Sequence, residues 1–193
     1  MMVMPDFLTH YYERSAGPFS NLSMLPFAQA EEILEEIRRN GNRFASQRAS
    51  DYMQKRLALE DKIRMLFEAK GGKPRLTRPH YLILGTCPWL KEWYVDGQEL
   101  QIKLILIPED CVSFTYGDSF PAMNYQDGKP YRGQVYTLGE LSEVVRQYGL
   151  PQLWNPDGMA GPERYMEAQL WDDMPLKEYL DIRLSLAGLH TGS

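Results

Sequence analysis

The chain has 193 residues, of which 44% are hydrophobic and 24% are charged. At this length one folded unit buries roughly 70% of the surface of its unfolded chain, so neither a metal nor a disulfide is needed for a core. The composition excludes a largely disordered chain, and no window approaches the run of about 18 apolar residues that a transmembrane helix needs. We therefore expect a single domain over residues 1–193, with a frayed tail at 189–193.

The cellular compartment is inferred from the N-terminus and from the cysteines. Met1–Thr9 shows no basic segment followed by an apolar stretch, which is the pattern of a secretory signal. The two cysteines, Cys87 and Cys111, both lie in apolar segments. Cysteines of this kind are usually reduced, buried thiols. We predict a cytoplasmic protein with no disulfide and no contact with a membrane.

The net charge of −5 conceals a segregation of charge along the chain. Residues 38–78 contain 12 Lys and Arg against 4 Asp and Glu, whereas residues 91–193 contain 8 against 16. In some proteins a basic segment binds phosphate or nucleic acid, and in others it pairs with acidic residues of its own fold. We favour the second interpretation, so nucleic acid is not an expected partner.

Two helices are predicted in the first half of the chain. Residues 26–39 carry apolar side chains at helical spacing, with Ser23 as a candidate cap and Gly41 as a stop signal. A longer helix is expected over residues 46–70, with inward-facing Met53, Leu57, Leu59, Ile63, Leu66 and Phe67. This second helix carries half of the 12 basic residues of the segment 38–78.

Short apolar runs in the middle of the chain predict strands. Residues 81–84 are too uniformly apolar for a surface helix and indicate a buried strand. The pair Asp96-Gly97 favours a type I′ turn, so residues 93–95 and 98–107 are predicted to form a hairpin. Residues 112–116 form a further predicted strand. The connections are too short for parallel crossovers, so we expect an antiparallel sheet.

The last third of the chain mixes loops with one helix and one strand. Residues 120–133 and 151–162 are predicted surface loops. Between them, Thr137 and Glu140 match a capping box in front of an apolar helical stripe. Residues 164–171 alternate apolar and polar side chains, as a half-buried strand does. The order of elements predicts an α+β fold, in which N-terminal helices and one later helix pack on a mainly antiparallel sheet.

The sequence lacks the residue patterns that several common catalytic mechanisms need. The three histidines are isolated, and no His-Glu-x-x-His or Cys-x-x-Cys pattern is present, so no metal site is predicted. Gly117-Asp118-Ser119 is similar to the nucleophile block of one group of serine hydrolases, but the Asp-x-x-His that accompanies this block is absent. Neither Gly72-Lys73 nor Gly128-Lys129 completes a phosphate-binding loop.

Two segments, residues 9–14 and residues 113–119, combine aromatic side chains with hydrogen-bonding side chains. A ligand pocket uses this mixture. The second segment supplies Ser113, Tyr116 and Asp118 as candidate ligand-binding residues. Alternation along an edge strand produces the same mixture without a ligand, and this alternative stays open.

Parts of the sequence resemble known proteins. The run 112–121, together with residues 161–165, resembles conserved bacterial proteins to which no activity is assigned. Residues 9–11, residues 21–25 and the helix after them are similar to the opening of ADP-ribosyltransferase-like proteins of the His-Tyr-Glu type. Residues 167–171 are similar to the last strand of that family.

The second resemblance implies an enzyme that binds NAD. In that family a His contacts the NAD ribose, a Tyr lies against the nicotinamide, and a late Glu is catalytic. By this resemblance His10 and Glu167 are the catalytic residues, and the tyrosine is either Tyr81 or Tyr116.

Two functions from different classes follow. The first is a nucleotide- or NAD-type ligand-binding protein, with transferase activity if His10 and Glu167 share one cleft. The second is a noncatalytic module that offers a contiguous apolar surface of more than roughly a few hundred Å² to a protein partner. The sequence does not specify which small molecule or which protein would bind.

Overall fold

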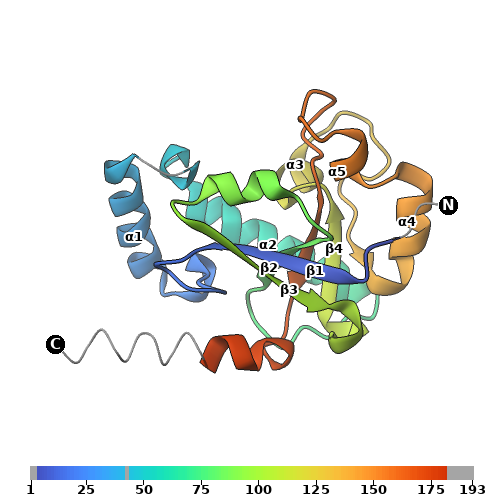
Figure 1. Ribbon diagram of the computed structural model, residues 1–193, viewed down its shortest axis with the longest axis horizontal. Helices are drawn as coiled ribbons and strands as arrows, with labels where there is room; N and C mark the ends of the chain where they lie inside the picture. Colours follow the sequence, from blue (N-terminus) through green and yellow to red (C-terminus); the bar gives the residue numbers. More distant parts are fainter. Residues whose placement is uncertain (1–3, 42–43, 182–193) are drawn as a thin grey trace.

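The computed structural model describes residues 4–41 and 44–181. Its centre is a six-stranded antiparallel sheet in the order β3-β1-β2-β6-β4-β5 (Figure 1). The strands are β1 (Phe7–Glu13), β2 (His80–Leu84), β3 (Gly97–Lys103), β4 (Val112–Tyr116), β5 (Tyr136–Thr137) and β6 (Met166–Leu170). The fold class is α+β, which confirms the prediction from the order of elements.

The two faces of the sheet differ in chemistry. Glu167 of β6 lies between Ile83 of β2 and Thr115 of β4 in the strand register. This side is called the polar face here, because it also carries the buried Thr9, Ser113 and Gln169. The opposite side, the apolar face, carries Leu8, Leu82, Leu84, Phe114, Tyr116, Met166, Ala168 and Leu170. Successive side chains of a strand point to opposite faces, so neighbours in sequence have different surroundings.

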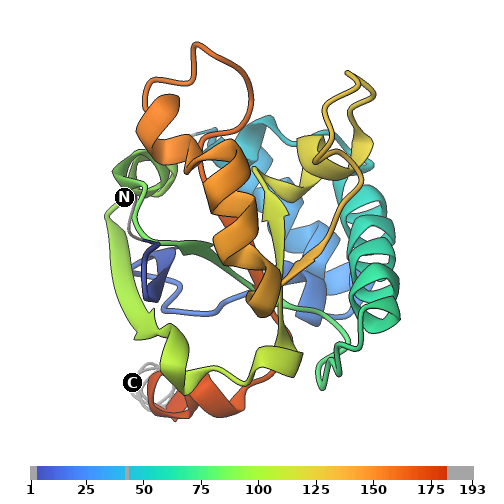
Figure 2. The same ribbon diagram turned by 90° about the vertical axis from the view of Figure 1, so that its right-hand side faces the viewer.

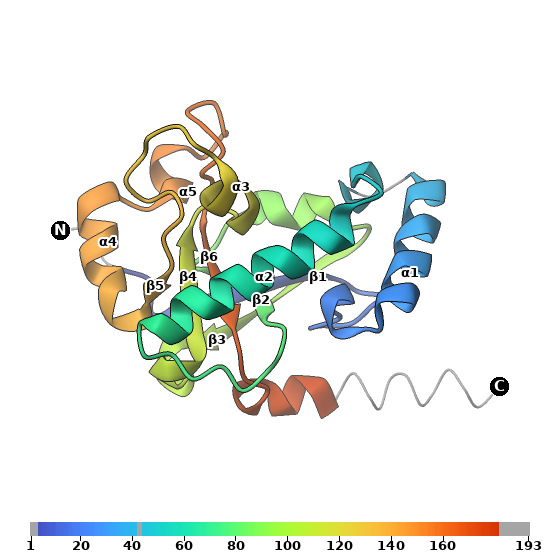
Figure 3. The same ribbon diagram turned by 180° about the vertical axis from the view of Figure 1, so that it is seen from behind.

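A helix covers each face of the sheet. Helix α2 (Tyr52–Ala69) crosses the polar face (Figure 3), where its apolar side chains contact Trp171. Helix α4 (Leu141–Tyr148) packs on the apolar face through Leu141, Val144 and Val145. Figure 2 shows the two helices on different sides of strand β4. Both faces of the sheet are therefore largely withdrawn from water.

Helix α1 (Phe27–Asn40) packs beside the start of α2. It ends at Gly41, whose positive φ of 63° lets its N–H donate to the carbonyl of Ile37. The predicted stop signal is thus confirmed. Pro26, and not Ser23, occupies the cap position.

The predicted hairpin is wrong. Residues 93–95 form no strand, since Trp93 ends the 3₁₀ helix η3 (Pro88–Trp93) and residues 94–95 lead into a turn, and β3 pairs with β1 instead. The type I′ turn is not formed either, because only Asp96 has a positive φ, of 54°, whereas Gly97 does not and begins β3. The second predicted helix is also shortened, since η2 (Phe44–Gln47) is a separate 3₁₀ helix and α2 begins at Tyr52.

Both segments predicted as loops contain a short helix, α3 (Ser119–Asn124) and α5 (Pro151–Trp154). The strand predicted to be half-buried, β6, is buried at every position because α2 covers the face that was expected to meet water. The capping box of Thr137 and Glu140 is confirmed at η6 (Leu138–Glu140), which leads into α4. The remaining 3₁₀ helices are η1 (Leu22–Met24), η4 (Leu104–Leu106), η5 (Glu109–Cys111) and η7 (Met174–Leu176).

The basic segment is largely paired with acidic residues of the same chain, as expected. Ion pairs join Arg56 to Glu60, Arg64 to Glu68, Lys70 to Glu140, Lys73 to Asp110, Arg75 to Asp172 and Arg78 to Asp61. Three of these acidic partners come from the acidic second half of the chain. These three partners offset part of the positive charge of the segment within the fold.

Cys87 and Cys111 are free and buried, which confirms the prediction of two core thiols. Within the described residues, no helix has the length and apolar character needed to cross a membrane. The tail predicted to fray, residues 189–193, lies outside the described residues.

Candidate functional site

A cavity of about 350 Å³ opens on the polar face of the sheet. Strands β1, β2 and β6 contribute its floor, and α2, η2, η3 and the start of α3 contribute its walls. Three of the expected site residues line it: Tyr81, Asp118 and Glu167. The cavity thus gathers residues that are far apart in sequence.

Glu167 lies at the floor of the cavity, with 7% of its surface exposed. Burial, reinforced by the charge of Asp118, raises the pKa of Glu167 to about 8. The nearby Arg56 and the hydrogen bond from Gln169 act in the opposite direction without cancelling the effect. Glu167 therefore holds a proton at neutral pH, and it can donate that proton to a ligand.

Asp118 supplies a second carboxyl group to the same cavity. Its Oδ1 accepts a hydrogen bond from the backbone N–H of Phe120 at 2.8 Å, at the start of α3. Its Oδ2 accepts from the hydroxyl of Tyr165 at 3.1 Å. These two donors hold the carboxyl group of Asp118 in a fixed orientation beside the site of Glu167.

A chain of buried hydrogen bonds orients Glu167. The indole Nε1 of Trp171 donates to Oγ of Ser113 at 2.9 Å, and this hydroxyl donates to Oε1 of Gln169 at 2.9 Å. Nε2 of Gln169 then donates to Oε1 of Glu167 at 3.2 Å and to Oγ1 of Thr115 at 3.2 Å. The hydroxyl of Thr115 donates to the carbonyl of Gly117 at 3.0 Å, so it can only accept from Gln169, and this sets the orientation of the amide. Ser113, expected to bind ligand, instead supports the site from behind the cavity.

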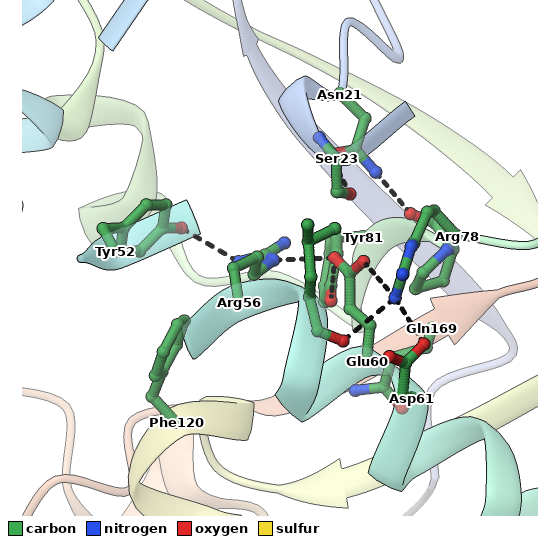
Figure 4. A network of polar contacts seen from close by, with 12 residues as sticks. Asn21, Ser23, Tyr52, Arg56, Glu60, Asp61, Arg78, Tyr81, Phe120 and Gln169 are labelled. Atoms are coloured by element: carbon green, nitrogen blue, oxygen red, sulfur yellow. Dashed lines mark hydrogen bonds and ion pairs between the residues drawn. The ribbon is translucent and has the colours of Figure 1, made fainter. Parts of the chain in front are cut away.

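A buried network of polar side chains forms the wall nearest α2 (Figure 4). Nε of Arg56 donates to Oε1 of Glu60 at 2.8 Å, and the hydroxyl of Tyr81 donates to the same oxygen at 2.9 Å. Arg78 lies 3.6 Å from the second carboxyl oxygen of Glu60. The guanidinium of Arg56 also lies over the ring of Tyr81, 3.8 Å from its centroid. Arg56 therefore already has an anionic partner within the protein.

Aromatic rings surround the mouth of the cavity. Phe44 of η2 stacks on Trp93 of η3, with ring centroids 4.0 Å apart and an interplanar angle of 17°. Tyr52 of α2 stacks on Phe120 of α3 at 5.5 Å and 26°. All four rings line the cavity. Flat aromatic walls of this kind suit a ligand that contains a planar ring.

His10 lies on the apolar face, away from this cavity. Thr9 and Tyr11 of β1 line the cavity, and strand alternation turns His10 to the opposite side. Its Nε2 accepts from the backbone N–H of Phe19 at 2.9 Å, which leaves Nδ1 to donate to the carbonyl of Tyr81 at 2.9 Å. Burial lowers the pKa of His10 to about 4, so the ring is neutral. The structure therefore does not place His10 in one cleft with Glu167, and we assign it a structural role.

Tyr116 also lies on the apolar face, and the structure gives it structural contacts. Its hydroxyl donates to the carbonyl of Tyr148 at 2.7 Å and accepts from the indole Nε1 of Trp154 at 3.1 Å. These contacts tie β4 to the end of α4 and to α5. Of the two candidate tyrosines, Tyr81 is the one that lines the cavity.

Tyr11 of the candidate segment 9–14 lines the cavity, whereas sequence reasoning missed Arg48, Arg56 and Tyr165, which line it too. A signal for Arg56 was present in the predicted second helix. Met53, Arg56, Glu60, Ile63 and Phe67 are spaced three and four residues apart, so they share one face of α2. Two charged residues on an inward stripe indicate a buried polar site, because such charges are rarely buried without partners.

A second cavity, of about 420 Å³, lies at the end of β2 and is lined by Cys87, Trp89, Gln152 and Arg164 among others. In the described part of the chain no Asp or Glu lines it. Burial raises the pKa of the Cys87 thiol, so the reactive thiolate is scarce at neutral pH. The cavity on the polar face is therefore the stronger candidate for chemistry.

Residues 4–41 and 44–181 contain no group of three or more His, Cys, Asp or Glu side chains arranged to hold a metal ion. Comparison of the chain with protein-family models, with curated proteins and with solved structures gave no match. The site is therefore interpreted from its own geometry and chemistry.

Proposed function

We propose that the protein binds a nucleotide-type small molecule in the cavity on the polar face and cleaves its N-glycosidic bond. The observation that carries this proposal is the presence of two carboxyl groups, Glu167 and Asp118, in one aromatic-walled cavity. The pKa of Glu167, raised to about 8, makes it the proton donor of the pair. Cleavage of a glycosidic bond commonly uses two carboxyl groups that differ in protonation.

The two carboxyl groups have separate roles in this reaction. Glu167 donates its proton to a nitrogen of the base, and the bond between C1′ and the base breaks with its electron pair going to the base. Asp118 stabilises the positive charge that develops on the ribose. Water adds to C1′, and the proton that it loses restores the acid form of Glu167. The products are the free base and the ribose portion of the ligand.

This proposal differs from the roles implied by the resemblance to ADP-ribosyltransferase-like proteins. His10 takes no part in it, since the ring lies on the apolar face and both of its nitrogens have partners. Nicotinamide is already cationic in NAD and leaves without receiving a proton, whereas a purine or pyrimidine base leaves more readily when protonated. A protonated Glu167 therefore favours a nucleotide with a neutral base over NAD.

The size and the walls of the cavity support a ligand of this class. A volume of about 350 Å³ falls within the range of small-molecule sites. The stacked pairs Phe44–Trp93 and Tyr52–Phe120 provide apolar surfaces for a planar base.

The test is release of free base from a panel of purine and pyrimidine nucleosides, their 5′-monophosphates and NAD, followed by chromatography. We expect turnover of at least one nucleoside or nucleotide with a neutral base. Glu167→Gln should lower kcat by about 100-fold or more, because general acid catalysis contributes that much. Asp118→Asn should lower kcat by a similar factor through the loss of charge.

The matched control is Glu32→Gln, which removes an exposed carboxyl group of α1. It should leave kcat unchanged. The proposal is wrong if no member of the panel is cleaved, or if Glu167→Gln retains wild-type turnover while remaining folded.

A noncatalytic interaction module is the second candidate. The observation in its favour is a group of exposed apolar side chains in and after α5, with Leu153 63% exposed, Trp154 40% and Met159 85%. A module would lose binding of its protein partner in a Leu153→Glu, Met159→Glu double variant, whereas the enzyme would keep its turnover. The free thiols Cys87 and Cys111 fit a cytoplasmic location for either function.

A further inference from the structure

Arg48 differs from the other basic residues near the cavity. Between Phe44 and Arg78, each of the other described Lys and Arg side chains has an ion pair or a hydrogen bond within the protein. Within that described stretch, only the guanidinium of Arg48 has neither. The guanidinium lies over the ring of Tyr52, whose centroid is 4.3 Å from Cζ of Arg48.

The position of Arg48 is nevertheless fixed by its neighbours. Nε of Arg38 donates to the carbonyl of Arg48 at 3.0 Å, and Nη2 of Arg38 donates to the carbonyl of Ala49 at 2.8 Å. These two bonds tie the segment after η2 to helix α1. The side chain of Arg48 lines the cavity and is partly withdrawn from water.

No carboxylate of the described residues forms an ion pair with Arg48, although an anion beside this partly buried guanidinium would be stabilised. Burial lowers the pKa of Arg48, and the attraction of Tyr52, Tyr94 and Asp118 offsets only part of this effect. Asp118 attracts Arg48 electrostatically across the cavity, but the two residues form no ion pair in the described structure. The cavity therefore has a free cation at one side and the carboxyl groups of Asp118 and Glu167 at another.

We propose that Arg48 binds the phosphate group of the ligand, so that the substrate is a nucleotide and not the free nucleoside. This inference deepens the proposed function and rests on it for the identity of the sugar and base. A planar guanidinium donates two parallel N–H bonds to phosphate oxygens, which gives both affinity and orientation. With the phosphate at Arg48 and the base against the aromatic walls, the ribose lies toward Asp118.

Arg56 does not compete for this role. Its Nε is committed to Glu60, and its Nη1 lies 3.1 Å from the hydroxyl of Tyr52 (Figure 4). A phosphate at Arg56 would have to displace a fully buried carboxylate. Arg48 can accept a phosphate without breaking any existing ion pair.

The experiment measures affinity for matched pairs of adenosine and AMP, uridine and UMP, and nicotinamide riboside and its mononucleotide, by calorimetry at low ionic strength. In the wild-type protein we expect at least one phosphorylated member to bind about 10-fold or more tightly than its unphosphorylated partner. Arg48→Gln should remove this preference while changing the affinity for the unphosphorylated member less than about threefold. Arg48→Lys should restore part of it, because the charge remains but the paired N–H donors do not.

The matched control is Arg39→Gln, which removes an exposed positive charge from α1 outside the cavity. This variant should keep the full preference for phosphate. Loss of the preference here would mean that net charge, and not Arg48, is responsible for it. Melting temperatures without ligand establish that each variant is folded.

The outcomes separate this inference from the proposed function. Absence of a preference for phosphate in all three pairs, including the case in which nothing binds, overturns the role of Arg48. Retention of the preference in folded Arg48→Gln also overturns it. If base is released and the release depends on Glu167, but phosphate is not preferred, the proposed function stands and the role of Arg48 fails. If phosphate is preferred in the wild type and not in Arg48→Gln, but no base is released, Arg48 binds phosphate and the proposed cleavage fails.

Discussion

The side-chain amide of Gln169 donates to Oε1 of Glu167 at 3.2 Å, and the amide cannot turn around because the Thr115 hydroxyl, which donates to the carbonyl of Gly117, must accept from the same nitrogen. Oε1 of Glu167 must therefore be an acceptor. A proton held by this carboxyl group is directed to Oε2. The core thus fixes which oxygen of Glu167 acts as the acid.

The first prediction concerns Gln169→Met, which keeps the length of the side chain and removes its amide. The hydrogen bond from Gln169 lowers the pKa of Glu167, so its loss should raise this pKa further, by about one unit. Titration of the Glu carboxyl carbons by NMR measures the shift directly. Gln101→Met, at an exposed position of β3, is the control and should leave the titration of Glu167 unchanged.

The sequence predicted those parts of the fold that local signals specify. Gly41 ends α1, and Thr137 with Glu140 begins η6, because these residues act on the backbone next to them. The hairpin failed although Asp96 does turn the chain with positive φ. Strand pairing is a nonlocal choice, and β3 gains a longer partner in β1 than residues 93–95 offer.

The site could be predicted only in part for the same reason. Asp118 was a candidate because of the residue types in its segment, and Glu167 and Tyr81 were candidates by resemblance; all three line the cavity. The resemblance also predicted that His10 would share this site. Adjacent residues of a strand point to opposite faces of the sheet, so His10, next to Thr9 in β1, lies on the apolar face. The protonation of Glu167 depends on burial by α2 and on Asp118, so no local pattern contains it.

The second prediction is a pH dependence of stability that originates at Glu167. Its pKa is about 8 in the folded protein and 4.5 in an ordinary peptide. The unfolded chain releases the proton above pH 4.5, while the folded protein keeps it until about pH 8. The stabilisation that protonated Glu167 gives the folded protein is complete below pH 4.5. It falls by about 1.4 kcal/mol per pH unit as the pH rises from 4.5, and it is lost once the pH has risen through 8.

Glu167→Gln should abolish this contribution. We expect the free energy of unfolding of the variant, relative to the wild type, to increase from pH 5 to pH 8 when both are measured by urea denaturation. Glu32→Gln, at an exposed position, should follow the wild-type curve. Parallel curves for wild type and Glu167→Gln would mean that Glu167 is ionised in the folded protein.

The third prediction treats His10 as a structural residue with the opposite pH dependence. Its pKa is about 4 in the folded protein and 6.5 when free, so its stabilising effect is present above pH 6.5 and is lost as the pH falls through 4. His10→Phe retains a ring against Phe19 but leaves the N–H of Phe19 and the carbonyl of Tyr81 without their partner. We expect a loss of about 1–3 kcal/mol at pH 7 and a smaller loss at pH 5. Base release by the folded fraction should stay at the wild-type rate, and a selective loss of kcat would return His10 to the active site.

The last prediction compares two ion pairs of the same kind on one helix. Arg56–Glu60 and Arg64–Glu68 are both Arg–Glu pairs four residues apart on α2, with N–O distances of 2.8 Å and 3.0 Å. The Glu60 side chain is fully buried, whereas the Glu68 side chain is 48% exposed. Glu60→Gln removes the anion that Arg56 and Arg78 share, so a buried positive charge loses its partner and unfolding should become easier by about 3–5 kcal/mol. Glu68→Gln should cost no more than about 0.5 kcal/mol, because water solvates the charge that remains. Urea denaturation of the two variants at pH 7 makes the comparison, and equal costs would show that the Glu60 network does not hold the wall of the cavity.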